Sequence, residues 1–136
     1  MAKLTHHEAL IHVMVTMSAV DRSMGDSEMA KMGDIINSMP IFADYNNDKL
    51  VADMQICSEI LQEDNGLDQI ISNAKESLPE HLHETAYAVA VEVAAADLKL
   101  EQTELRLLQL LRDEMGIDKL ACAAIERGAK ARYRRL

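Results

Sequence analysis

Apolar residues recur at helical spacing along almost the whole chain, and turn-forming residues divide this pattern into seven segments. No stretch alternates apolar and polar residues in the way a half-buried strand does. The pattern therefore predicts an all-α fold, a single helical bundle of about seven helices. Their expected ranges are approximately 5–20, 26–39, 48–63, 67–77, 77–96, 102–115 and 118 onward.

Capping and terminating residues mark the ends of these segments. Residues 5–8 form a capping box, in which Thr and Glu side chains accept hydrogen bonds from each other's amides. Residues 77–80 have the same pattern, with a proline in the first turn of the fifth helix. We expect Gly66 to end the third helix in the left-handed conformation, Gly116 to end the sixth helix, and Asp118 to cap the seventh.

One helix–turn–helix unit occurs twice. Residues 7–41 and 83–117 align at an offset of 76 with nine identities, where average composition would give roughly two. The identical pairs are His7/His83, Glu8/Glu84, Val13/Val89, Val15/Val91, Ala19/Ala95, Asp21/Asp97, Glu28/Glu104, Met39/Met115 and Ile41/Ile117. We therefore predict that residues 1–136 form one domain, in which the repeats pack as a pseudo-twofold pair of hairpins around an insert of two helices.

Each repeat contains the same ten-residue motif at its turn. The copies are Ala95-Ala96-Asp97-x-x-Leu100-x-x-x-Glu104 and the weaker Ala19-Val20-Asp21-x-x-Met24-x-x-x-Glu28. They resemble the tellurite-resistance TerB family, and the length, duplication and helix number extend the resemblance over nearly the whole chain. Arg22 and Leu98 stand where that family usually has Gly. The resemblance implies an all-helical cytoplasmic domain of tellurite and stress resistance, a metal site on an acidic face, and partnership with a TerC-like integral membrane protein.

The motif carboxylates support two interpretations. An Asp at a helix C-terminus needs donors from the following turn, whereas a Glu in the first turn of the next helix is favoured by the helix dipole. In the first interpretation each corner caps itself, with Met24 or Leu100 as its buried plug. In the second, the two corners meet and bind a hard divalent cation such as Ca²⁺ or Mg²⁺, which oxygen ligands favour over zinc or copper. The ligands would then be Asp21, Glu28, Asp97 and Glu104.

We expect no functional role for the histidines. His7 and His83 occupy equivalent places and should be exposed first-turn residues, about 21 Å along an ideal helix from the aspartates. His6 and His81 lie nearby, so only adventitious binding of a transition metal is expected there.

Sulfur-containing residues are expected in the core. Eight of the nine methionines lie in residues 1–54, mostly opposite apolar residues of the second repeat. Cys57 and Cys122 form no CxxC pair, so we expect two buried thiols.

Charge is distributed unevenly. The net charge is −9, but the last eleven residues, 126–136, hold five basic residues and one acidic residue. The other 125 residues therefore carry −13, which disfavours nucleic acid and favours cations or a basic partner surface. The basic tail either complements the dipole of the last helix or contacts an anionic membrane surface or an acidic partner.

Two function classes remain. No Gly-rich phosphate loop, placed nucleophile or dinucleotide fingerprint is present, so we expect no enzyme. No apolar run suits a bilayer span and no signal peptide precedes the first helix, so we expect a cytoplasmic protein, peripheral at most at the inner face of the cell membrane. The chain is then either a cation-binding protein of a stress-resistance system, or a metal-free adaptor that docks onto a membrane or chaperone partner.

Overall fold

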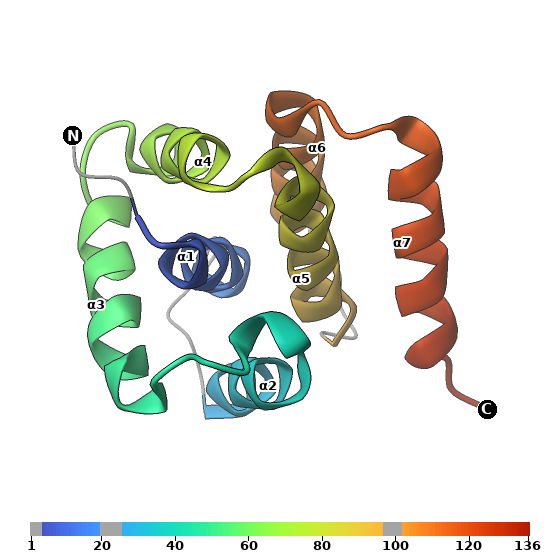
Figure 1. Cartoon of the computed structure of the whole chain (residues 1–136). Helices are drawn as coiled ribbons and strands as arrows, with labels where there is room; N and C mark the ends of the chain where they lie inside the picture. Colours follow the sequence, from blue (N-terminus) through green and yellow to red (C-terminus); the bar gives the residue numbers. More distant parts are fainter. Residues whose placement is uncertain (1–3, 20–25, 97–101) are drawn as a thin grey trace.

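The computed structural model describes residues 4–19, 26–96 and 102–136, without the side chains of residues 19, 26–28 and 96. Those residues form seven α-helices, three short 3-10 turns and no strand, which confirms the all-α prediction (Figure 1). The elements are α1 (His6–Ala19), α2 (Asp26–Ser38), η1 (Pro40–Phe42), η2 (Asn47–Lys49), α3 (Leu50–Leu61), α4 (Gly66–Ser77), η3 (Glu80–Leu82), α5 (His83–Ala96), α6 (Gln102–Met115) and α7 (Lys119–Arg132).

The first helix, α1, lies in the middle of the bundle. It packs against α3, α4 and α5, which surround it in Figure 1. Every residue from Ala9 to Met17 is buried, including the polar His12 and Thr16. Helical spacing predicts a buried stripe that includes Ile11 and Val15, and both are buried, but burial extends to the other faces of this helix as well.

The equivalent helix of the second repeat, α5, is the other central element. It packs against α1, α2, α6 and α7. Both α1 and α5 have 14 residues, and small residues such as Ala86 and Ala90 bring neighbouring main chains close to α5. The repeats thus supply the two central helices, while the pseudo-twofold relation between the hairpins stays a prediction.

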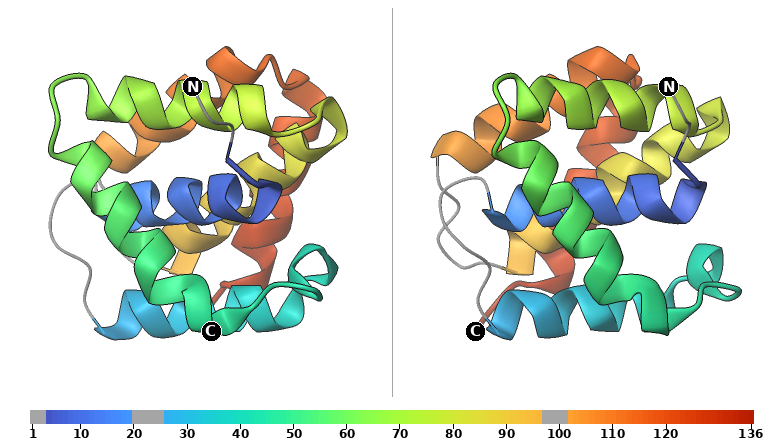
Figure 2. Two further views of the ribbon diagram at one scale, coloured as in Figure 1. Left: turned by 60° about the vertical axis from the view of Figure 1, so that its left-hand side comes forward. Right: turned by 90° about the vertical axis from the view of Figure 1, so that its left-hand side faces the viewer.

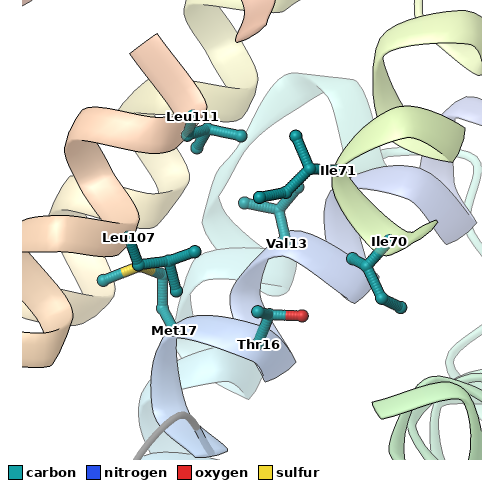
Figure 3. Close-up of a pocket in the computed structure, with 7 residues that line it drawn as sticks. All are labelled: Val13, Thr16, Met17, Ile70, Ile71, Leu107 and Leu111. Atoms are coloured by element: carbon teal, nitrogen blue, oxygen red, sulfur yellow. The ribbon is translucent and has the colours of Figure 1, made fainter. Parts of the chain in front are cut away.

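The third and fourth helices cover α1 with the faces that the sequence predicts. Met54 and Cys57 of α3 are buried, as are Ile70, Ile71 and Ala74 of α4. Side chains of α1, α4 and α6 point toward one another around a small apolar gap (Figure 3). The gap is part of the core, and its lining residues are Val13, Thr16, Met17, Ile70, Ile71, Leu107 and Leu111.

The apolar face of α6 is rotated from the one that the helical spacing of Leu105, Leu108, Leu111 and Met115 predicts. Leu108, Leu111 and Met115 are buried as expected. Leu107 is also buried, whereas Leu105 is 44% exposed. The helix meets α4 as well as α5, and this second contact turns Leu107 inward.

Most sulfur-containing side chains fill the core. Cys57 and Cys122 are buried thiols, which confirms the prediction. Met14, Met17 and Met32 are buried, but Met29 is 42% exposed. The predicted plugs Met24 and Leu100 lie outside the described residues.

Three helix ends follow their predicted caps and two do not. The Glu8 amide donates to Thr5 Oγ1 at 3.1 Å and the Thr5 amide donates to Glu8 Oε1 at 2.8 Å. Gly116 has a φ of 61°, and Asp118 Oδ2 accepts from the Ala121 amide at 3.1 Å.

The predicted capping box at Ser77 is wrong. Ser77 is the last residue of α4, and its hydroxyl accepts a hydrogen bond from the Leu4 amide at 3.1 Å. Pro79 instead precedes the 3-10 turn η3, and α5 begins only at His83. The hydroxyl therefore joins the N-terminal segment to α4.

The predicted left-handed position at Gly66 is also wrong. Asn65 adopts that conformation, with a φ of 62°, and Gly66 is the first residue of α4. Gly66 is needed for another reason: an added Cβ would overlap the carbonyl oxygen of Ile60 and lie 2.9 Å from the Cα atom of Leu61. The absence of a side chain thus lets α4 begin directly against the end of α3.

Gly66→Ala should lower the free energy of unfolding by roughly 1–3 kcal/mol, because the new methyl group would overlap the main chain. Gly33→Ala is the matched control, since no atom lies within 4 Å of its added carbon. That change should stabilise the chain by roughly 0.5–1 kcal/mol through helix propensity. Urea unfolding measures both variants, and a Gly66→Ala protein as stable as the parent would contradict the close approach.

Candidate functional site

The four predicted cation ligands are described unequally. Asp21 and Asp97 lie outside the described residues. Glu28 belongs to the first turn of α2, but its side chain is not described. Glu104 lies in the first turn of α6, as predicted, and is 6% exposed. The convergence of these four carboxylates therefore stays a prediction.

The helix ends that border the two motif corners lie on the same side of the molecule. Both views of Figure 2 show the C-terminal ends of α1 and α5 and the N-terminal ends of α2 and α6 on that side. Burial of the Glu104 carboxylate has a desolvation cost that polar partners must offset. Glu104 does take part in polar or electrostatic contacts. This edge of the bundle therefore holds at least one buried carboxylate with polar surroundings.

The two repeat-equivalent histidines are not the exposed residues that we predicted. His7 is 9% exposed, and its Nε2 donates to the carbonyl oxygen of Ile41 at 2.8 Å. His83 is half-buried, and its Nε2 donates to the carbonyl oxygen of Leu78 at 3.1 Å. Each ring fills the space beside the start of its helix and supplies a donor to a main-chain carbonyl there.

A cluster of side chains able to bind a metal ion lies at the start of α1. His6, His7 and Asp44 each offer one ligand atom within 4.8 Å of the other two. The Nε2 atom of His7 lies 3.2 Å from Asp44 Oδ1. The sequence predicted no built metal site at the two histidines and did not identify Asp44 as a ligand. Asp44 lies 37 and 38 positions from them, and no local sequence pattern indicates a contact over that separation.

A buried polar group joins α1 to α3 and to the segment before it. His12 and Asp53 are 2% and 3% exposed, and the Tyr45 hydroxyl donates to Asp53 Oδ2 at 2.6 Å. Burial lowers the pKa of His12, so its imidazole is neutral at pH 7. Burial also raises the pKa of Cys57 to about 11, so this thiol is a poor nucleophile. These residues hold the core together and offer no reactive centre.

From the sequence, the last helix is expected to fray into the basic C-terminal segment, but the structure shows this segment anchored to the bundle. The α7 helix continues to Arg132, which forms an ion pair with Glu92 of α5. The Tyr133 hydroxyl donates to Glu92 Oε2 at 2.6 Å, and Lys31 of α2 lies 4.0 Å from the same carboxylate. Burial raises the pKa of Glu92, but the hydrogen bonds from Tyr133 and Arg132 outweigh it and leave the pKa below the ordinary 4.5.

A second contact fixes α7 farther along the bundle. The Tyr87 hydroxyl of α5 donates to Glu126, and Arg112 of α6 lies 3.2 Å from the same carboxylate. Three helices are therefore joined through Glu126, although α7 packs mainly on α5.

A groove of about 1020 Å³ lies between α6 and α7, and residues of α5 also line it. Alanines line its floor, and Leu105 and Leu120, which are 44% and 78% exposed, lie at its edge. Its charged lining is basic except for Glu126 and consists of Arg112, Arg127, Lys130, Arg134 and Arg135. The groove thus combines an apolar floor with a cationic edge in a chain of net charge −9. We call it the α6–α7 groove.

The family model for the tellurite resistance protein TerB matches residues 7–127. The chain belongs to the TerB family. The match includes both motif copies, so membership confirms the resemblance and identifies a domain of the tellurite-resistance type. Comparisons with curated proteins and with solved structures gave no match.

The TerB match spans both central helices and most of α7, so the α6–α7 groove lies within the matched region except for its last residues. Among the described helices of this TerB domain, none is long and apolar enough to cross a membrane.

Glu92→Gln should lower the free energy of unfolding of the TerB domain by roughly 1–3 kcal/mol at pH 7, because it removes the charge that Arg132 and Lys31 contact. Folding lowers the pKa of Glu92, so its contribution is complete above pH 4.5 and is lost as the pH falls through the folded value. The difference between parent and variant should therefore shrink in acid.

Urea unfolding at neutral and acidic pH measures this difference. Glu84→Gln, an exposed position of the same helix, is the control and should leave stability unchanged. Identical midpoints for the parent and Glu92→Gln at pH 7 would show that α7 is not anchored through this carboxylate.

Proposed function

We propose that this TerB-family chain is a non-enzymatic component of a tellurite- and stress-resistance system that responds to a hard divalent cation. The proposed ligands are the motif carboxylates Asp21, Glu28, Asp97 and Glu104. The observation that carries the proposal is the placement of the four helix ends next to these motifs on one side of the molecule (Figure 2). The buried carboxylate of Glu104 at this edge supports it.

Electrostatics favours a cation at this edge. Carboxylates brought together repel one another, so they must protonate or gain positive charge. Arg22 is the one basic residue inside the first motif and Lys99 the one inside the second, so internal neutralisation is incomplete. Oxygen ligands without Cys or His suit Ca²⁺ or Mg²⁺, and water would complete the coordination shell, so the affinity should be modest.

Millimolar Ca²⁺ or Mg²⁺ should raise the melting temperature of the parent protein, because the unfolded chain has no such cluster. Isothermal titration calorimetry should show binding, and the double variant Asp21→Asn/Asp97→Asn should lose both responses. Asp34→Asn/Asp113→Asn, at two exposed positions outside the motifs, keeps the same charge change and should respond like the parent. A parent protein with no binding heat and no thermal shift would leave the self-capped corner as the better interpretation.

The second candidate function is that of an adaptor, and the α6–α7 groove favours it. An apolar floor with exposed leucines and a cationic edge suits an amphipathic helix that carries acidic residues. We propose such a helix, from a membrane or chaperone partner such as a TerC-like integral membrane protein, as the occupant. The binding surface would then be the basic groove and not the acidic face that the sequence suggested.

Growth on tellurite distinguishes the two functions in cells whose own copy of the gene is deleted. If docking carries the function, Lys130→Glu/Arg134→Glu should abolish resistance, whereas Asp21→Asn/Asp97→Asn should retain it. If cation binding carries it, the outcomes reverse. Lys49→Glu/Lys75→Glu, at exposed positions away from the groove, is the charge-matched control. Full resistance in the groove variant would rule out the adaptor function for this surface.

A further inference from the structure

The start of α1 and the segment after η1 together carry three side chains with ligand atoms for a transition metal ion. His6 and His7 are the first two residues of α1, and Asp44 follows η1. One ligand atom of each lies within 4.8 Å of the other two, and no other such group of His, Cys, Asp or Glu occurs among the described side chains of residues 4–18, 29–95 and 102–136. We infer that these three residues form a site for Zn²⁺ or a similar borderline transition metal ion.

The central ligand, His7, is held in position by its surroundings. Its Nε2 lies 2.8 Å from the carbonyl oxygen of Ile41 and 3.2 Å from Asp44 Oδ1. Its ring stacks on Phe42 at a centroid distance of 5.5 Å and meets the edge of Tyr45 at 5.1 Å. A side chain that packing has already fixed loses little conformational freedom when it binds an ion.

The geometry around Nε2 of His7 suits the replacement of its proton by an ion. Two oxygens, from Ile41 and Asp44, face one ring nitrogen that carries a single proton. In a tetrahedral zinc site with bonds of about 2.0–2.2 Å, neighbouring ligand atoms lie about 3.3 Å apart. The distance of 3.2 Å from Nε2 to Asp44 Oδ1 is close to that value.

The second nitrogen comes from His6, whose ring centroid lies 4.1 Å from that of His7. Ion binding through Nε2 moves the remaining ring proton of His7 to Nδ1. The carbonyl oxygen of Ile41 then loses its donor and faces the ion. Water fills the remaining coordination positions, because His6 is half-buried and Asp44 is exposed.

The ligand set selects the class of ion. Two imidazoles and one carboxylate favour Zn²⁺, Ni²⁺ or Cu²⁺ over Ca²⁺ and Mg²⁺, which prefer oxygen. The positive end of the α1 dipole disfavours a cation, but the carboxylates of Asp44 and Glu8 offset it. This site differs from the motif corners in its residues and in its ion, so it does not rest on the proposed function.

Binding would join the start of α1 to the segment around residue 44. Asp44 lies 37 and 38 positions from His7 and His6, so the unfolded chain does not hold all three ligands together. Zn²⁺ should therefore raise the melting temperature.

Isothermal titration calorimetry with Zn²⁺ tests the site on the full chain after removal of any histidine tag. The parent should bind one ion per chain, and His6→Ala and Asp44→Asn should each weaken the affinity by about tenfold or more. His81→Ala and Asp48→Asn are the matched controls at exposed positions and should leave the affinity unchanged. Melting curves without metal verify that every variant is folded.

Two outcomes would overturn the inference. One is a parent protein that binds no Zn²⁺ at millimolar concentration, and the other is an unchanged affinity in both His6→Ala and Asp44→Asn. Asp21→Asn/Asp97→Asn should keep the parent affinity for Zn²⁺, and a loss there would place zinc at the motif corners instead. The thermal shift and binding heat that Ca²⁺ produces in His6→Ala should equal those of the parent. The experiment can therefore disprove the zinc site and the motif-corner cation site independently.

Discussion

The burial of α1 on all sides is the constraint on which the rest of the structure depends. A 14-residue helix with nine consecutive buried residues must be covered on every face, and α3, α4 and α5 supply that cover. Its polar side chains must also find partners inside the core. Thr16 accordingly donates to the carbonyl oxygen of His12 at 2.7 Å, and neutral His12 lies near the buried Asp53. The insertion of α3 and α4 between the repeats supplies two of the three helices that cover the buried α1.

The proposed sites lie at the ends of α1 and at the edge of the bundle. The small gap that Figure 3 shows is apolar and lies within the core. A group able to hold an ion lies instead where α1 begins, at His6 and His7, and the proposed cation ligands of the first TerB motif follow the other end of α1 in the sequence. The α6–α7 groove is a third place, and α7 is held beside it by the contacts of Arg132 with Glu92 and of Glu126 with Tyr87.

Local sequence predicted the helices because their periodicity, caps and breaks act within a few residues. The capping box at Thr5 correctly marked the start of α1, and Gly116 correctly marked the end of α6. The repeated motif also pointed to the TerB family, which the family match confirms. What failed depended on contacts between distant residues. The main chain of Ile60 leaves no room for a side chain at Gly66. The hydroxyl of Ser77 accepts a hydrogen bond from the Leu4 amide, and the ring of His7 donates one to the carbonyl oxygen of Ile41. Among the predicted cation ligands, Glu104 is the one whose side chain is described, and its burial was not evident from its sequence position.

The central claim is that the two ends of α1 carry separate sites for different classes of ion. A two-dimensional ¹H–¹⁵N NMR titration of one labelled sample tests it most directly. The account predicts that Ca²⁺ shifts amide signals next to the motif corners, such as those of Ser18 and Thr103. Zn²⁺ should instead shift signals around Glu8 and Asp44. Shifts of the same set of amides by both ions, or no shifts at either end of α1, would contradict the account.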